Sequence, residues 1–114
     1  MFSEEKKLEP AFYMAAVIIE ASSNVPGDQP LYEERFILVS AHSEEEAHEK
    51  AVGSVGEPHS YLNQFGATIT WSLKEIVTVT ETLPRELIDG TELFYRYFRD
   101  YNAYHHVFLE KEPD

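Results

Sequence analysis

The sequence of 114 residues contains no cysteine, and this absence excludes several kinds of protein. Without cysteine there is no disulfide framework, no thiolate nucleophile and no cysteine-ligated zinc or iron–sulfur site. Secretion into an oxidising compartment therefore has no support, and a cytoplasmic location is the expectation. Residues 1–10 carry charges of both signs and no apolar core, which is typical of a frayed leader and not of a signal peptide.

Long hydrophobic runs are also missing. The longest apolar run extends from Ala11 to Ile19, far short of the roughly 20 residues that a membrane-spanning helix needs. The sequence therefore predicts no membrane span.

Positive charge is scarce, because 9 Lys and Arg residues stand against 21 Asp and Glu residues and give a net charge of −12. Between Leu8 and Leu73 the only bases are Arg35 and Lys50. Nucleic acids are bound mainly by clustered Lys and Arg, so this class of partner is excluded. An acidic surface keeps a protein soluble, and it can also attract a basic protein by long-range steering.

Motifs for catalysis and metal binding are absent from the sequence. It has no Gly-x-Ser-x-Gly, no Ser-x-x-Lys and no glycine-rich phosphate loop. None of the five histidines forms the His-x3-His spacing that places two imidazoles on one helix face. We therefore expect no catalytic residues, no metal and no cofactor, and a non-enzymatic protein is favoured over an enzyme.

The first half of the chain predicts two strands and a helix. Residues 12–20 are apolar in both phases of a two-residue repeat, as in a strand covered on both faces, and residues 31–41 form a second strand after a Pro-Gly loop. A wide antiparallel hairpin is the simplest pairing. In residues 43–53, Ser43 and Glu46 match a capping box and Gly53 a helix stop. The predicted apolar face of this helix comprises Ala47, Ala51 and Val52.

The second half predicts a hairpin and a last helix. Residues 59–62 form a short strand, Asn63 to Gly66 match a type I turn, and residues 67–80 alternate between apolar and polar side chains. Glu75 and Ile76 break this alternation together, which indicates a bulge. After a turn at residues 86–92, Thr91 is the expected cap of an aromatic helix built on Leu93, Phe94, Tyr97, Phe98 and Tyr101.

The predicted fold is α+β with the order β-β-α-β-β-α, an antiparallel sheet with the helices packed on one face. We expect a single domain over residues 11–108, preceded by the leader of residues 1–10 and followed by a frayed tail of residues 109–114.

Several of these segments together resemble a family of small bacterial proteins known only as domain of unknown function 4288. The resemblance covers about residues 12–98 and implies a small stand-alone bacterial α+β domain with no assigned reaction. Its residues are Leu31-Tyr32-Glu33-Glu34, Ser43-x-Glu45-Glu46-Ala47, Tyr61-x-Asn63-x-x-Gly66 with Trp71, and Asp89-Gly90-Thr91-Glu92-x-x-x-Arg96. Phe12-Tyr13 stands where the family pattern opens with Trp-Tyr, and Tyr95 stands where it has a small residue.

Three functions are compatible with this sequence. The first is an acidic protein-binding domain, such as an immunity or antitoxin-like inhibitor of a basic toxin. The second is a homo-oligomeric structural or regulatory module, for example a homodimer. The third is a small-ligand binder or enzyme with a pocket at Tyr61, Asn63 and Trp71. The candidate partner-binding residues of the first are Glu44, Glu45, Glu49, Asp89, Glu92, Tyr101 and Tyr104.

Overall fold

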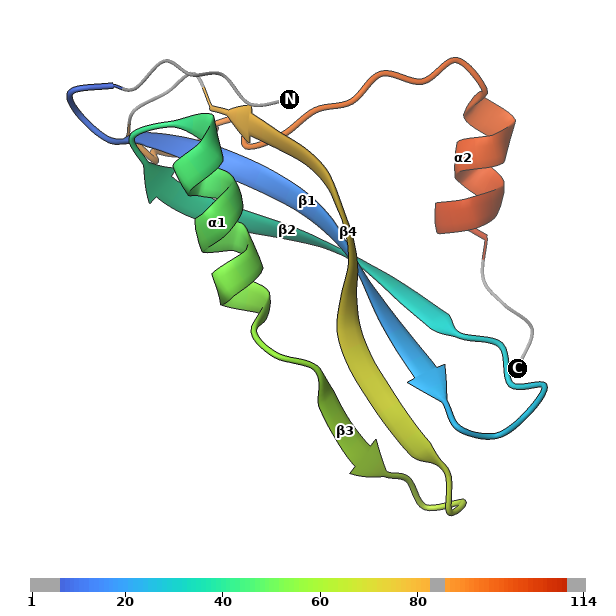
Figure 1. Ribbon diagram of the computed structural model, residues 1–114. Helices are drawn as coiled ribbons and strands as arrows, with labels where there is room; N and C mark the ends of the chain where they lie inside the picture. Colours follow the sequence, from blue (N-terminus) through green and yellow to red (C-terminus); the bar gives the residue numbers. More distant parts are fainter. Residues whose placement is uncertain (1–6, 83–85, 111–114) are drawn as a thin grey trace.

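The computed structural model describes residues 7–82 and 86–110, in which four strands form one antiparallel sheet with two helices (Figure 1). The order of the strands across the sheet is β2-β1-β4-β3. This arrangement confirms the α+β class. Residues 1–6 of the expected leader and residues 111–114 of the expected tail lie outside the described residues. The elements in chain order are β1 Ala11–Ser23, β2 Leu31–Ala41, α1 Glu44–Val55, β3 His59–Leu62, β4 Thr68–Glu81 and α2 Tyr101–Phe108.

Strand β1 is the centre of the structure, because β2 pairs along one of its edges and β4 along the other. Its side chains are buried on both faces, as its doubly apolar sequence predicts. Val17 and Ile19 point toward the helix-covered face, whereas Met14 and Ala16 point to the opposite face. Both faces of the sheet therefore need a cover at β1.

Helix α1 covers the first face and approaches the sheet closely through two alanines. Ala47 packs with Tyr13 and Ala51 packs with Val17, and both alanines are fully buried. Val52 was expected on this face but is 39% exposed, because a helix presents only a narrow contact stripe to a sheet.

The sequence predicts the start of α1 correctly but not its end. Ser43 is the N-cap, as predicted, and its hydroxyl accepts a hydrogen bond from the Glu46 amide at 3.1 Å. The predicted stop at Gly53 was wrong, because the helix continues through it to Val55. Gly56 is the C-cap, and its φ of 79° is an angle that residues with a side chain rarely adopt.

The β3–β4 hairpin forms at the predicted turn. The amide of Gly66 donates to the carbonyl of Asn63 at 3.2 Å, and Gly66 has a φ of 83°. The short strand β3 pairs only with residues 68–71, so the rest of β4 has no strand on that side within the described residues.

The predicted irregularity in β4 is confirmed and consists of two register shifts against β1. They fall between Ala16 and Val17 and between Ile18 and Ile19 of β1. As a result Ile76 packs against the core below α1, whereas Val77, which the alternation placed in the core phase, is exposed. The extra residues turn the strand so that its apolar side chains stay on the covered face.

The opposite face is covered by a segment without regular secondary structure. The rings of Phe94 and Phe36 lie 5.1 Å apart, and Arg96 donates to the carboxylate of Glu34 at 2.7 Å. The predicted helix after Thr91 was therefore wrong, because residues 91–98 are irregular. Thr91 instead closes the turn at Gly90, where its hydroxyl accepts from the Ile88 amide.

Helix α2 begins only after Asp100, whose carboxylate accepts from the Ala103 amide at 3.0 Å. Within the described residues α2 contacts no strand, and Figure 1 shows it standing apart from the sheet. The packing of both helices on one face is therefore not confirmed: α1 packs on the sheet and α2 does not.

The close contact of α1 gives a stability prediction. We expect Ala51→Leu to lower the free energy of unfolding by about 1–3 kcal/mol, because added methyl groups cannot fit a fully buried site. Val52→Leu, which enlarges an exposed position, should change it by less than about 0.5 kcal/mol. Urea denaturation of both variants measures the difference, and equal effects would show that α1 does not depend on small residues at the contact.

Candidate functional site

The outer face of α1 carries the first group of predicted partner-binding residues. Glu45 and Glu49 lie one turn apart on this face, and both are exposed. Within the described part of the chain neither carboxylate forms an ion pair. Glu44, at the first helical position, is half-buried. The two exposed glutamates form a surface that we call the α1 carboxylate face.

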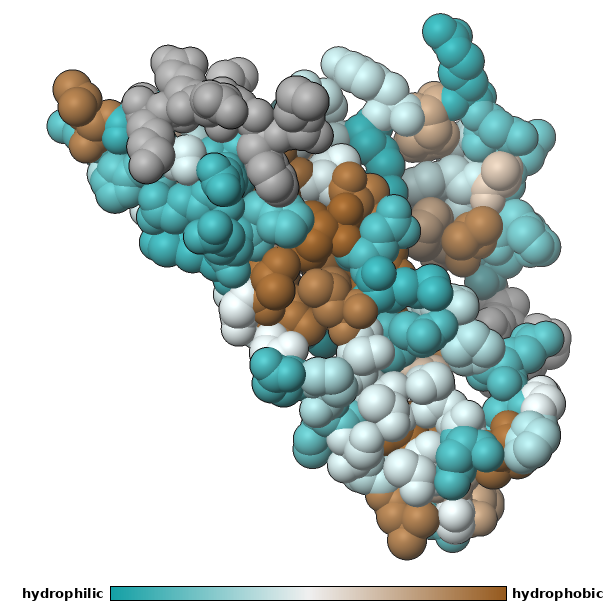
Figure 2. Space-filling view, in the orientation of Figure 1, coloured by the Kyte–Doolittle hydropathy of each residue, from teal (hydrophilic) through white to brown (hydrophobic). Residues whose placement is uncertain are grey.

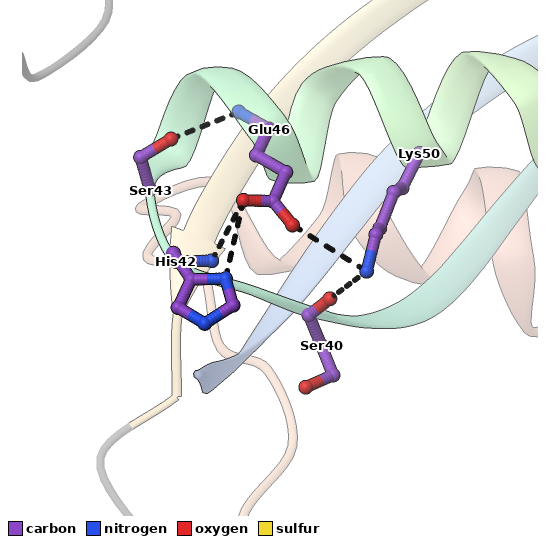
Figure 3. A network of polar contacts seen from close by, with 5 residues as sticks. All are labelled: Ser40, His42, Ser43, Glu46 and Lys50. Carbon is purple, nitrogen blue, oxygen red and sulfur yellow. Dashed lines mark hydrogen bonds and ion pairs between the residues drawn. The ribbon is translucent and has the colours of Figure 1, made fainter. Parts of the chain in front are cut away.

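The side of α1 next to β2 differs from this face, because its charges are satisfied internally (Figure 3). Glu46 accepts from the His42 amide at 3.2 Å, lies 3.4 Å from the His42 Nδ1 and lies 3.5 Å from the Lys50 Nζ. Lys50 also donates to the Ser40 carbonyl at 2.6 Å. The network therefore ties the first two turns of α1 to the end of β2.

The hydrogen bond from the His42 amide is the main cause that holds the pKa of Glu46 below the ordinary value for glutamate, and the charges of His42 and Lys50 add to it. Glu46 also reaches one residue further back than the predicted capping box, since it bonds the amide of His42 and not that of Ser43.

Nearly all positive charge in the described residues is neutralised by a neighbouring carboxylate. Five of the six Lys and Arg side chains in these ranges form ion pairs, and Arg99 is the exception. The pairs are Lys7–Glu81, Arg35–Glu33, Lys50–Glu46, Lys74–Glu20 and Arg96–Glu34. Because carboxylates outnumber these cations, the molecule carries a net negative field.

The acidic side chains near the start of α1 also act on the hydroxyl of Tyr13. Burial raises the pKa of Tyr13, and the negative charges of Glu81, Glu44 and Glu46 raise it further. Figure 2 shows hydrophilic side chains over the outer surface of α1, beside an apolar strip on the sheet. Ile76 and Val79 are among the partly buried apolar residues that pack against the core below α1.

The remaining predicted partner-binding residues lie elsewhere. Asp89 and Glu92 follow β4, and Glu92 lies on the opposite side of the sheet from α1, beside Thr80. Tyr101 and Tyr104 are on α2, which does not contact α1 within the described residues. The structure thus separates the seven residues into three glutamates on α1, two carboxylates in the segment after β4 and two tyrosines on α2.

The residues of the predicted pocket lie in or beside the β3–β4 hairpin. The Oδ1 of Asn63 accepts from the amides of Phe65 at 2.9 Å and Ala67 at 3.0 Å, so this side chain builds the turn. Trp71 packs against the core below α1, and Tyr61 lies on the neighbouring strand. Asn63 and Trp71 thus have structural roles, whereas the side chain of Tyr61 is 45% exposed.

A cavity of about 510 Å³ lies between β4 and the irregular segment, at a place that the sequence did not indicate. Of its charged groups, Glu81 pairs with Lys7 and Arg96 pairs with Glu34, whereas Glu92 forms no ion pair within the described residues. The cavity exists because residues 92–96 cross the sheet without helical structure. Its lining comprises Thr78, Thr80, Glu81, Thr82 and residues 92–96.

A search of the described residues finds no group of three or more His, Asp or Glu side chains placed to hold a metal ion. In the same ranges no helix has the length and hydrophobicity to cross a membrane.

The fold and this surface define a small α+β domain with an antiparallel sheet, one packed helix and a strongly acidic exterior. Residues 12–95 match the family described as "Domain of unknown function (DUF4288)", which covers most of the chain. The chain belongs to this family, as its motifs indicated. Searches of curated proteins and of solved structures gave no match.

The depressed pKa of Glu46 gives a prediction on pH dependence. A carboxyl group whose pKa is lowered by folding stabilises the fold above its unfolded pKa, near 4.5, and this stabilisation is lost as the pH falls through the folded pKa. Glu46→Gln should therefore lower the free energy of unfolding at neutral pH and lose this difference in acid.

Urea denaturation of both proteins at neutral pH and at about pH 3 measures the effect. Glu45→Gln, one position earlier and without an ion pair in the described residues, is the control and should show no such pH-dependent difference. Equal stability of Glu46→Gln and the parent protein at neutral pH would contradict the prediction.

Proposed function

We propose that this protein is a non-enzymatic protein-binding domain that recognises a basic partner through the α1 carboxylate face. The observation that carries the proposal is the pairing of charges. Lys50, the one lysine or arginine on α1, is bonded to Glu46 and to the Ser40 carbonyl, so within the described residues Glu45 and Glu49 have no ion-pair partner.

The rigidity of α1 supports this assignment. The helix is fixed to the sheet by Ala47 and Ala51 and to β2 by Lys50, so the two carboxylates stand on a preorganised backbone. Binding then orders few groups besides the side chains themselves, which reduces the entropic cost of association. Charges of one sign on such a face raise the association rate of an oppositely charged partner.

Within this class, an immunity or antitoxin-like inhibitor of a basic bacterial toxin in the cytoplasm is the narrower form of the proposal. It is supported by the size of the domain, its charge of −12 and the absence of a catalytic motif in its sequence. Such inhibitors must be complementary to a cationic surface, and electrostatic complementarity supplies both speed and specificity.

A charge reversal tests the α1 carboxylate face. The purified protein is used to capture partners from a lysate of its host at low salt, and the bound proteins are eluted with rising salt. We expect a basic protein to elute as salt increases, and we expect its recovery by Glu45→Lys/Glu49→Lys to fall by about tenfold or more, because the substitutions reverse both carboxylates.

The matched control is Glu57→Lys/Glu75→Lys, which makes the same change in net charge at two exposed residues outside α1. Its recovery of the partner should fall only by the smaller amount that the change in net charge alone causes. Equal recovery of that partner by the Glu45→Lys/Glu49→Lys variant would contradict the proposal.

A further inference from the structure

The C-terminal arm, residues 91–110, is held to the sheet at its beginning and leaves it afterwards. Phe94 and Arg96 contact β2, as described above. From residue 95 to residue 110 every residue is exposed, including all eight residues of α2. Tyr97 is 91% exposed and Tyr101 is 62% exposed.

The exposed part of the arm is aromatic on one side. The ring of Tyr104 stacks on Phe98 at 4.7 Å and lies 5.0 Å from Phe108. Tyr101, Tyr104 and Phe108 repeat at three and four residues and so share one face of α2. We call this surface the α2 aromatic face. Its large rings gain little from burial in the single chain, although aromatic residues dominate the energetics of interfaces.

Helix α2 is too short to be stable by itself. Isolated helices below about 12–15 residues are marginal in water, and α2 has eight residues with no contact to another helix or strand within the described residues. Its capping bond from Asp100 contributes only about 1 kcal/mol. A helix of this kind is maintained when something covers its apolar face.

The charge of the arm indicates what covers it. Residues 91–110 carry two arginines against Glu92, Asp100 and Glu110, a net charge of −1, whereas the whole chain has a net charge of −12. Within the described residues Arg99 is the one Lys or Arg side chain without a carboxylate partner. The arm is therefore nearly neutral, so two copies that meet through their arms avoid most of the repulsion between their acidic surfaces.

The dimensions of the chain agree with a missing partner. The accessible surface is 9068 Å², a total that also counts the residues outside the described ranges, against about 6,400 Å² for a compact monomer of this mass. The radius of gyration is 17.4 Å, against about 13 Å for a compact domain of this length. A stable dimer buries about 800 Å² on each partner, well within this excess.

We infer that the C-terminal arm is a dimer interface, in which a second copy of the chain covers the α2 aromatic face and Arg99 meets a carboxylate of that copy. The same surface is used twice, as in a two-fold symmetric dimer. The inference is independent of the basic partner proposed above, because it involves α2 and leaves the α1 carboxylate face exposed.

Sedimentation velocity across roughly 1 to 100 µM measures the assembly, since interfaces of standard size give affinities from micromolar downward. We expect the parent chain to sediment at twice its mass of 13.1 kDa over at least the upper part of this range. Tyr101→Glu/Phe108→Glu should sediment as a monomer, because two carboxylates would be buried without partners. A parent chain that is monomeric throughout would overturn the inference.

The matched control is Tyr61→Glu/Phe65→Glu, which makes the same two changes at exposed rings of the β3–β4 hairpin. It should remain a dimer. Loss of the dimer in both variants to the same extent would show that added negative charge, and not the arm, is responsible, and would overturn the inference. Circular dichroism of both variants checks that the sheet is retained, as expected for residues outside the core.

A third variant tests the arginine without altering the rings. Arg99→Glu should weaken the dimer by about tenfold or more, and Lys74→Glu, an equal charge change on β4, should weaken it much less. Hydrogen exchange gives a second readout: the amides of residues 101–108 should be protected at high concentration and exchange freely in Tyr101→Glu/Phe108→Glu. Equal exchange in the two proteins would overturn the assignment of the interface to α2.

Discussion

The contact between α1 and β1 is the interaction on which the rest of the structure depends. A helix can approach a sheet this closely only where its facing side chains are small, and Ala47 and Ala51 meet this condition above Tyr13 and Val17. The contact buries the central strand on one face and fixes the axis of α1. The orientation of the helix follows from it, since the buried alanine stripe forces Glu45 and Glu49 to the outer side.

The placement of charge follows from the same contact. Because α1 starts directly after β2, its first turn lies near the end of that strand, where Glu46 and Lys50 satisfy each other and the backbone. Pairs of this kind at a surface contribute little to stability. These pairs neutralise the local cations, so no free lysine or arginine on the same helix offsets the charge of its exposed carboxylates. A helix with free lysines between its glutamates would present a nearly neutral face to a partner.

The sequence predicts local structure well where a short segment determines it. Ser43 caps its helix because its hydroxyl acts on an amide three residues away, and Asn63 and Gly66 form their turn by the same local chemistry. The helix stop was wrong because Gly53 and Gly56 are equivalent as residues, and the position of the end depends on how far α1 extends over the sheet. The bulge in β4 was visible as a break in alternation, but the choice of Ile76 for the core over Val77 depends on the register with β1.

The candidate surfaces show the same division. The glutamates of α1 could be predicted because their exposure follows from one amphipathic helix. The irregular path of residues 91–98 could not be predicted, because Leu93, Phe94, Tyr97 and Phe98 have helical spacing. Two tertiary contacts hold this segment instead, Phe94 on Phe36 and Arg96 on Glu34. One local feature of the sequence marks the position of α2: Asp100 precedes a run of nine residues without Asp, Glu, Lys or Arg, in a chain that is otherwise rich in carboxylates.

The two surfaces lie on opposite sides of the sheet, and this separation has a consequence for binding. The irregular segment crosses the face that α1 does not cover, so the arm departs on the side away from the α1 carboxylate face. Two chains joined through their arms would keep both acidic helices exposed and would carry a combined charge of twice −12. Repulsion between two such bodies opposes association, so it favours a contact through the part of the chain with the smallest net charge. The arm meets this condition, and a partner with two cationic sites could then be held at both helices with an avidity that neither provides alone.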